Sequence, residues 1–217
     1  MNRTLLAAAV VVAAAAWWWW GQDETGYEEY EEEGGDALPG ILEDVVTAVD
    51  QITGGGMKLS AMSRVTAHDL QDRNVQAFLR VVRRGEGTAD EGGYKRLFGG
   101  GTFTSFTDHP RVLVKKSGYN STAAGAYQFI QSTWDKTRDV MKLPDFSPAS
   151  QDKGAVGLIA ARGALADVKA GRLEAAIKKC CHEWASLPFS PYGQPRISME
   201  TARSTFMNAG GMELVGA

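Results

Sequence analysis

The sequence predicts a mostly α-helical α+β protein with a small β-hairpin lobe, preceded by an N-terminal hydrophobic helix. Apolar residues recur at helical spacing in several segments after residue 74. Residues 92–119, rich in glycine, β-branched and aromatic residues, interrupt these segments, and an uncharged run occupies the N-terminus. With 217 residues, 44% of them hydrophobic and 23% charged, the chain can bury one substantial core but not two large ones.

The N-terminal run from Thr4 to Trp20 carries no charge and follows Arg3 and the amino terminus. A helix of this length spans roughly 25 Å, slightly less than a typical hydrocarbon core. Its four consecutive tryptophans suit the lipid–water interface, and no Lys or Arg occurs from Gly21 to Met57. We therefore expect residues 1–20 to form a transmembrane signal-anchor helix, oriented N-inside and C-outside. A cleaved signal peptide is the alternative.

Residues 21–73 are expected to link this helix to the main domain. Residues 21–36 are acidic, contain glycine and lack aliphatic side chains, which predicts disorder. Apolar residues at 38, 41, 42, 45, 46, 49 and 52 then follow helical spacing and predict a short amphipathic helix over about 40–52. Residues 57–73 are interpreted as a polar connector with no clear period.

The main domain is expected over residues 74–217 and begins with a helix over 75–84, for which Asn74 is the predicted N-cap. One face of that helix carries Val75, Phe78, Leu79 and Val82. Beyond the glycine-rich stretch, helical segments are predicted near 125–141, 148–163, 164–170, 172–187 and 198–209. Such a domain has two lobes, and a long polymer could lie in the cleft between them.

Charge and cysteine usage exclude several functions. A formal net charge of -3 gives no general basic field, and the basic clusters RVVRR and VKK are short, so nucleic acid is not expected as a partner. The neighbouring cysteines Cys180 and Cys181 form neither a disulfide framework nor a CxxC pattern. His109 and His182 lack partners at metal-ligand spacing, so we expect no metal site and no cofactor.

Ordered motifs along nearly all of this domain resemble one known family. They are EGT at 86–88, LFGGGTFTSFTDHPR at 97–111, STAAGAYQF at 121–129, DFSPASQD at 145–152, ARGAL at 161–165, EWASLP at 183–188, YGQ at 192–194 and AGG at 209–211. Over about residues 75–212 the chain resembles the bacteriophage lambda lysozyme (endolysin) family, lytic transglycosylases with a lysozyme-like fold. Ala123 and Ala126 depart from it, standing where the family pattern has Gly and Arg, which would remove any substrate contact of that arginine.

The resemblance implies that Glu86 is the catalytic acid. Cleaving the β-1,4 bond between N-acetylmuramic acid and N-acetylglucosamine requires a proton on the leaving oxygen as C1 becomes oxocarbenium-like. The donor must hold that proton near neutral pH, and both the end of the 75–84 helix and a cleft wall would raise its pKa. Gly85 would let the chain turn off the helix, and Gly87 would leave room for a sugar ring. A solvated glutamate beside helix-ending glycines is the plain alternative.

The family chemistry needs no second acid. The sugar's N-acetyl group would stabilise C1 and its C6 hydroxyl would attack, giving a 1,6-anhydromuramic end, while Glu86 acts first as acid and then as base. A hydrolytic muramidase would instead need a second carboxylate. Its candidates are Asp90, Glu91 and Asp108, which are explained equally well as turn residues.

Six further residues are candidate substrate contacts: Ser121, Thr122, Tyr127, Gln128, Tyr192 and Gln194. The tyrosine and glutamine at 127–128 follow a glycine at an expected helix start, similar to the G-x-x-Q element on which such folds position the N-acetylmuramoyl group. The tyrosine could equally be a core ring, and the hydroxyls at 121–122 could be N-caps. The residues at 192–194 could line the far cleft wall or belong to a plain loop.

The resemblance implies an enzyme whose partner is bacterial peptidoglycan. The uncharged N-terminal run adds the expected location, with residues 4–20 in the host inner membrane and the catalytic domain in the periplasm. Two settings remain open: host lysis, and wall penetration by a virion, in which case other virion proteins are partners and the enzyme is virion-associated. The alternative class is a membrane-anchored, non-catalytic glycan-binding or virion structural protein on a lysozyme-like fold. Glu86 argues against that class, because such a protein would be expected to lack the acid.

Overall fold

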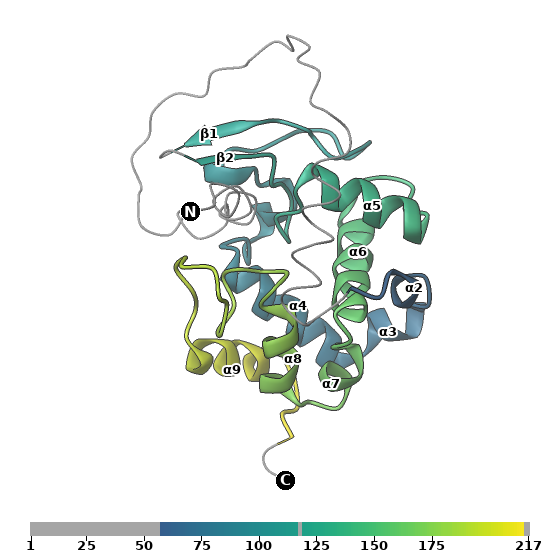
Figure 1. Cartoon of the computed structure of the whole chain (residues 1–217), viewed down its shortest axis with the longest axis vertical. Coiled ribbons are helices and arrows are strands. Elements are labelled where there is room, and N and C mark those ends of the chain that lie inside the picture. The colour runs from purple at the N-terminus through teal and green to yellow at the C-terminus, as the bar shows by residue number, and fades with distance from the viewer. Residues whose placement is uncertain (1–56, 117–118, 215–217) are drawn as a thin grey trace, which may run out of the picture.

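The computed structural model describes residues 57–116 and 119–214, which are mostly helical and include one two-stranded antiparallel sheet (Figure 1). The helix expected at residues 1–20, the acidic segment 21–36 and the amphipathic helix expected at about 40–52 lie outside the described residues. Within the described residues, no helix combines the length and the apolar character needed to span a membrane.

The first described segment is helical, so the polar connector expected over residues 57–73 is wrong. It forms α2 (Leu59–Met62) and α3 (Ala67–Gln71), and Met62, 1% exposed, belongs to the core. Thr66 and Asp69 form a capping box at the start of α3, each side chain accepting from the other residue's backbone N–H. Helices of four and five residues are too short to show a period in the sequence. The core therefore begins before residue 74, where we expected the domain to start.

Helix α4 (Arg73–Gly85) agrees closely with the predicted helix over 75–84. Its predicted apolar face is buried: Val75, Phe78, Leu79 and Val82. The N-cap is Asp72 and not Asn74, because the Asp72 carboxylate accepts the N–H groups of Asn74 and Val75 at 2.9 and 3.1 Å. The buried Asn74 side chain instead binds other parts of the chain.

The C-terminal segment closes on the first turn of α4. Asn74 accepts the N–H of Met212 at 2.7 Å, and the Arg73 guanidinium donates twice to the carbonyl of Gly210, at 2.9 and 2.7 Å. The N–H of Leu214 donates to the carbonyl of Gly171 at 2.9 Å. Residues 210–214, which we call the C-terminal clasp, therefore hold the beginning of the helix that leads to Glu86.

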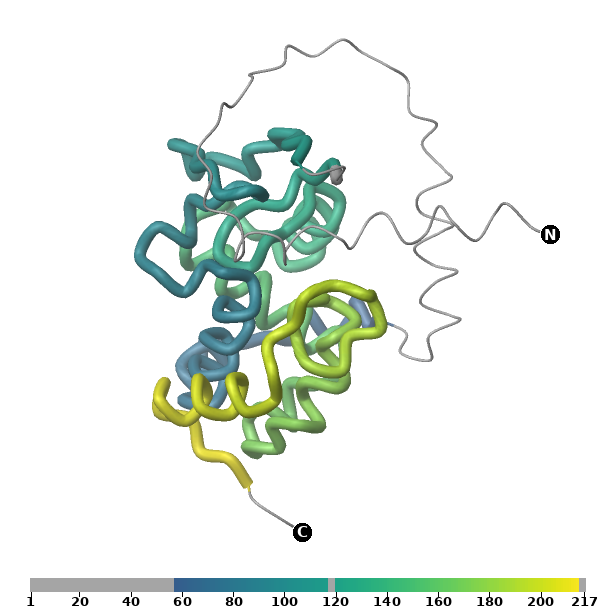
Figure 2. The backbone as a smooth tube through the Cα atoms, turned by 90° about the vertical axis from the view of Figure 1, so that its left-hand side faces the viewer, coloured from purple at the N-terminus to yellow at the C-terminus, as the bar shows by residue number. Residues whose placement is uncertain are grey.

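The hairpin lobe follows α4 and contains two 3₁₀ turns, η4 (Glu91–Lys95) and η5 (Phe98–Gly100), and the strands β1 (Val114–Lys116) and β2 (Tyr119–Ser121). The strands pair antiparallel, with Lys115 opposite Asn120. Figures 1 and 2 show this lobe, in teal, at one end of the molecule and α7–α9 at the other, and Figure 1 shows α4 between them. The small β-hairpin lobe is confirmed.

The remaining helices are α5 (Gln131–Met141), α6 (Pro148–Ala161), α7 (Leu165–Lys169), α8 (Leu173–Cys180) and α9 (Met199–Asn208). Two predicted helices are too long. The helix expected from 125 begins at Gln131, because Gly125 and Gln128 adopt left-handed φ angles of 78° and 47°. The helix expected over 172–187 ends at Cys180, and an irregular connection leads from there to α9.

Candidate active site

Glu86 directly follows the last residue of α4, and its N–H still donates to the carbonyl of Val82 at 2.9 Å. The residue is only 4% exposed, which excludes the solvated glutamate that the sequence left open. Gly87 then adopts a left-handed φ of 67°, which carries the chain away from the helix. The turn is therefore made by Gly87, and the role expected for Gly85 is wrong.

Ser186 meets Glu86 from the connection between α8 and α9. Its hydroxyl donates to Oε1 of Glu86 at 2.6 Å, and the residue is 1% exposed. Gly85 makes room for this contact, because a Cβ at that position would lie 2.6 Å from the Ser186 Oγ. Sequence reasoning did not single out Ser186, although it lies in the EWASLP motif. Only the fold brings the two segments together.

Burial raises the pKa of Glu86 from 4.5 to about 8, and the hydrogen bond from Ser186 opposes the rise. The cause is desolvation: the charged carboxylate loses its favourable contacts with water, so the neutral, protonated form is favoured and the pKa rises. The predicted direction is confirmed. At pH 7 this carboxyl group therefore holds its proton, as a general acid must.

The loop after Glu86 is fixed from two sides. The buried Arg83 guanidinium donates to the carbonyl of Thr88 at 3.0 and 2.9 Å and to that of Asp90 at 2.7 Å. The Thr88 hydroxyl donates to the carbonyl of Ala126 at 2.5 Å. These bonds attach the loop both to α4 and to the turn at 125–130, so the position of Glu86 depends on both lobes.

Tyr127 is a core residue, in agreement with the core-ring alternative, and its contact with substrate stays a prediction. Its ring is buried and its hydroxyl donates to Oδ1 of Asp152 at 2.6 Å, the same oxygen that Tyr94 reaches at 2.8 Å. Gln128 is half-buried in the turn, and its side-chain nitrogen donates to the carbonyls of Gly125 and Arg96 at 2.9 and 3.3 Å. Tyr127 and Gln128 therefore lie in the turn just before α5, and the bond from Gln128 to Arg96 connects this turn to the hairpin lobe.

Ser121 and Thr122 both accept backbone hydrogen bonds. The buried Ser121 Oγ accepts the N–H of Ala123 at 3.1 Å, and the Thr122 Oγ1 accepts the N–H of Gln131 at 3.0 Å. Gln131 is the first residue of α5, whose N-cap side chain makes no capping hydrogen bond. Thr122 therefore caps the start of α5 from outside the helix, which agrees with the capping alternative.

Tyr192 and Gln194 lie in the same connection as Ser186. The Tyr192 hydroxyl donates to the carbonyl of His182 at 3.4 Å, and the Gln194 Oε1 is buried without a hydrogen-bond partner among the described residues. Figures 1 and 2 show this connection at the edge of the helical lobe that faces the hairpin lobe. A contact of these two residues with substrate stays a prediction.

Two of the three candidate second acids are ion-paired with arginines. Asp108 binds Arg111 at 3.0 Å and Arg138 at 3.1 Å, and Asp90 binds Arg96 at 2.7 Å. Desolvation opposes the ionisation of Asp108, but hydrogen bonds from Arg111, from the His109 backbone and from Trp134 outweigh it and lower its pKa to about 2. The side chain of Glu91, at the start of η4, is exposed.

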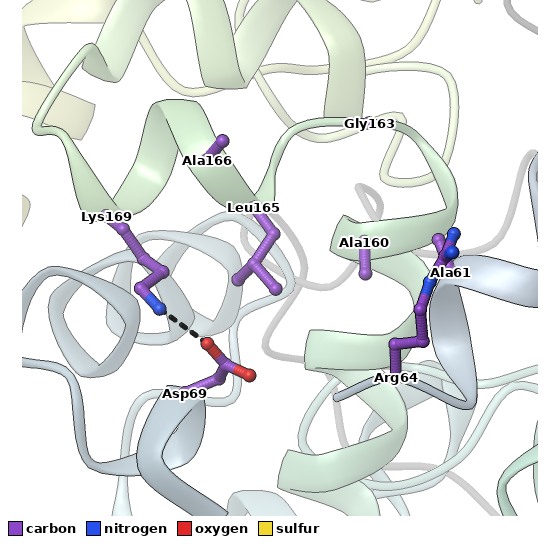
Figure 3. A pocket seen from close by; sticks show the side chains of 8 residues that line it. All are labelled: Ala61, Arg64, Asp69, Ala160, Gly163, Leu165, Ala166 and Lys169. Carbon is purple, nitrogen blue, oxygen red and sulfur yellow. Dashed lines mark hydrogen bonds and ion pairs between the residues drawn. The ribbon is translucent and has the colours of Figure 1, made fainter. Parts of the chain in front are cut away.

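A pocket in the described part of the chain lies away from Glu86 (Figure 3). Its lining residues are Ala61, Arg64, Asp69, Ala160, Gly163, Leu165, Ala166 and Lys169. The Lys169 ammonium binds Asp69 at 2.6 Å, and this hydrogen bond is the main cause that lowers the pKa of Asp69 to about 2. The pocket shares no residue with the Glu86 site. Residues 57–116 and 119–214 contain no group of three or more His, Cys, Asp or Glu placed to hold a metal ion.

Comparison with known proteins agrees with this architecture. The family model described as Endolysin matches residues 76–213. The endolysin of Escherichia phage P2 is 40% identical over 156 residues, covering 64% of this chain and 94% of that protein. The endolysin of Escherichia phage lambda is 41% identical over 144 residues, covering 63% of this chain and 90% of that protein.

Solved structures agree as well. Bacteriophage lambda lysozyme complexed with a chitohexasaccharide superposes with a TM-score of 0.63 at 38% identity, covering 65% of this chain and 97% of that one. A second structure of lysozyme from bacteriophage lambda gives a TM-score of 0.59 at the same identity and coverage. The fold is therefore lambda lysozyme-like, and the chain belongs to the endolysin family.

Proposed function

We propose that this protein degrades bacterial peptidoglycan by cutting the β-1,4 bond between N-acetylmuramic acid and N-acetylglucosamine, with Glu86 as the catalytic acid. The observation that carries the proposal is the buried Glu86 carboxyl at the end of α4, whose pKa of about 8 keeps it protonated at neutral pH. Similarity to two phage endolysins and to a lysozyme that binds a chitohexasaccharide supports a glycan substrate.

The reaction is a lytic transglycosylation. Glu86 gives its proton to the bridging oxygen, the bond from C1 to that oxygen breaks, and the N-acetyl group stabilises the positive charge at C1. The C6 hydroxyl of the same sugar then attacks C1, and its proton goes to the Glu86 carboxylate, which restores the acid. A hydrolytic muramidase, in which Asp90, Glu91 or Asp108 acts as a second carboxylate, is the alternative chemistry.

Glu86→Gln tests the proposal, because glutamine keeps the shape of the side chain and cannot give up a proton. We expect wall breakdown on purified sacculi to fall by about 10³-fold. Glu200→Gln, which changes an exposed carboxylate in the first turn of α9, is the matched control and should keep its activity. Near-normal cleavage by Glu86→Gln would remove Glu86 from the role, and a wild type that clears no sacculi in a zymogram would favour a non-catalytic glycan-binding protein.

Mass spectrometry of the wild-type digest tests the chemistry separately. A transglycosylase releases 1,6-anhydromuramic ends, which are lighter by one water than the ends a hydrolase leaves. Digestion in H₂¹⁸O sharpens the measurement, because only hydrolysis places the label at C1. If the wild type gives labelled ends and Glu86→Gln gives none, Glu86 is still the catalytic acid but the reaction is hydrolysis and not transglycosylation.

The setting proposed for this activity is host lysis, with residues 1–20 holding the catalytic domain on the periplasmic face of the inner membrane. Arg3 before the uncharged run, the four tryptophans at its end and the absence of Lys and Arg from Gly21 to Met57 support this orientation. Membrane fractionation of the full chain, with protease added to intact spheroplasts, tests it. A chain found in purified particles would favour the virion-associated setting instead.

A further inference from the structure

The contact between Ser186 and Glu86 joins two segments that are a hundred residues apart, and each segment is shaped for it. Gly85 is the last residue of α4 and is not among the residues with positive φ, so its backbone gives no reason for glycine. The steric reason is Ser186, because a Cβ at position 85 would lie 2.6 Å from its Oγ and 3.2 Å from its Cβ. Alanine would otherwise be favoured over glycine at a helical position.

Ser186 is itself held firmly. Its carbonyl accepts the N–H of Ile197 at 2.9 Å, and the neighbouring Leu187 donates to the carbonyl of Trp184 at 3.1 Å. The indole of Trp184 donates in turn to the carbonyl of Tyr127 at 3.2 Å. The hydroxyl therefore reaches Glu86 from a backbone that is fixed to the turn at 125–130 and to the segment before α9.

We propose that Ser186 is the positioning residue of the Glu86 acid: by donating to Oε1, it leaves Oε2 as the oxygen that carries the proton and delivers it. A protonated carboxyl group has one O–H and one carbonyl-type oxygen, and an oxygen that accepts a hydrogen bond is the one that favours the carbonyl form. The inference deepens the proposed function and rests on it, since an acid must present its proton toward one bond.

The competing arrangement reverses the bond, with the protonated Glu86 donating to the Ser186 oxygen. The two arrangements have opposite effects on ionisation. A donor to Oε1 favours the carboxylate, so its removal moves the titration of Glu86 to higher pH. An acceptor favours the protonated form, so its removal moves the titration to lower pH. The direction therefore separates them.

The experiment follows the side-chain carboxyl carbon of Glu86 by NMR in the ¹³C-glutamate-labelled full chain, with Glu86→Gln used to assign the resonance. In Ser186→Ala we expect the titration to move to higher pH and kcat on sacculi to fall by about 10- to 100-fold, with KM little changed. Ser190→Ala is the matched control, because Ser190 is buried in the same connection but accepts from Tyr192 and does not contact Glu86. It should leave both the titration and kcat as in the wild type.

Gly85→Ala breaks the same contact from the other side and keeps the serine, so it serves if Ser186→Ala does not fold. Its titration should also move to higher pH. An unchanged titration, or one that moves to lower pH, in either folded variant would overturn the inference. The titration needs no substrate, so this result is independent of the activity test. If Glu86→Gln kept full activity, the proposed function would fail while the titration still showed whether Ser186 donates to Glu86.

Discussion

Glu86 and Asp108 are both carboxylic acids in this domain, and the fold treats them in opposite ways. Asp108, 36% exposed at its side chain, is surrounded by Arg111, Arg138 and the indole of Trp134, which keep it ionised with a pKa of about 2. Glu86 is buried, its side chain has one hydrogen-bond partner among the described residues, the Ser186 hydroxyl, and its pKa is about 8. Both groups are carboxylic acids, so the difference between their pKa values comes from their surroundings: hydrogen-bond donors stabilise the Asp108 carboxylate, and the loss of water destabilises the Glu86 carboxylate.

The difference teaches which carboxyl group stabilises the fold and which one costs stability. Asp108 connects the hairpin lobe to α5, because Arg138 lies on that helix and Arg111 also binds Asp135 there, at 2.6 Å. Glu86 makes no ion pair within the described residues, and its burial is unfavourable for the charged form. A functional site often keeps such an unfavourable group because the chemistry needs it.

Replacing Glu86 should give the largest effect on stability. Its folded pKa of about 8 lies above its ordinary value of 4.5, so the contribution of the group to stability is fully present below pH 4.5 and is lost as the pH rises through 8. By pH 7 about 3 kcal/mol of this stabilisation is lost, because the unfolded chain releases the proton that the folded chain still holds. We expect Glu86→Gln to raise the free energy of unfolding by up to that amount at pH 7, in urea titrations, and by almost nothing at pH 4.5.

An equal gain at both pH values would show that the ionisation of Glu86 is not the cause. A destabilised variant at pH 7 would show that the carboxyl group is worth more to the fold than its burial suggests, and the contrast with Asp108 would disappear.

Asp108→Asn should act in the opposite direction and less strongly. The folded pKa of about 2 lies below 3.8, so the stabilisation from Asp108 is present above pH 3.8 and is lost as the pH falls through 2. Because the side chain is partly exposed, solvent screening reduces its contribution to about 1–2 kcal/mol. We expect this loss in the free energy of unfolding at pH 7, a smaller loss at pH 3, and cleavage of sacculi within twofold of the wild type. A large loss of cleavage in the folded variant would return Asp108 to the candidates for a second acid.

Thr122→Val should give the smallest effect. The Thr122 hydroxyl accepts the N–H of the first residue of α5, and the loss of a helix-capping bond costs about 0.5–1 kcal/mol. Thermal unfolding should show this loss, while kcat/KM on sacculi should stay within twofold of the wild type. Weakened glycan binding with unchanged thermal unfolding would place Thr122 in the substrate site instead.

The sequence predicted the long, strongly periodic parts of the fold, and the family resemblance drew attention to Glu86, which the structure buries. The apolar face of α4 was predicted because the helix spans 13 residues and repeats its pattern, whereas α2 and α3 are too short to show one. The N-cap was misplaced because Asp72 and Asn74 are both good capping residues, and only the contacts of Asn74 with Met212 decide between them.

The local environment of the acid could not be predicted from one sequence. Gly85 signalled an exit from the helix, but its role depends on Ser186, which lies a hundred residues further along the chain. The role of Tyr127 depends on Asp152 in α6, which accepts its hydroxyl. Sequence patterns describe neighbours along the chain, and these side chains are fixed by neighbours in space.

The C-terminal clasp has a consequence for how the protein is made. The side chains of Arg73 and Asn74 in the first turn of α4 bind Gly210 and Met212, so these bonds cannot form until residues 210–212 have left the ribosome. A chain that stopped at Asn208 would contain both Glu86 and Ser186 and still leave the side chain of Asn74 without the partners it has at Met212. Nascent or prematurely terminated chains should therefore be poorly assembled around the acid, and a fusion partner belongs beyond Leu214 on a spacer.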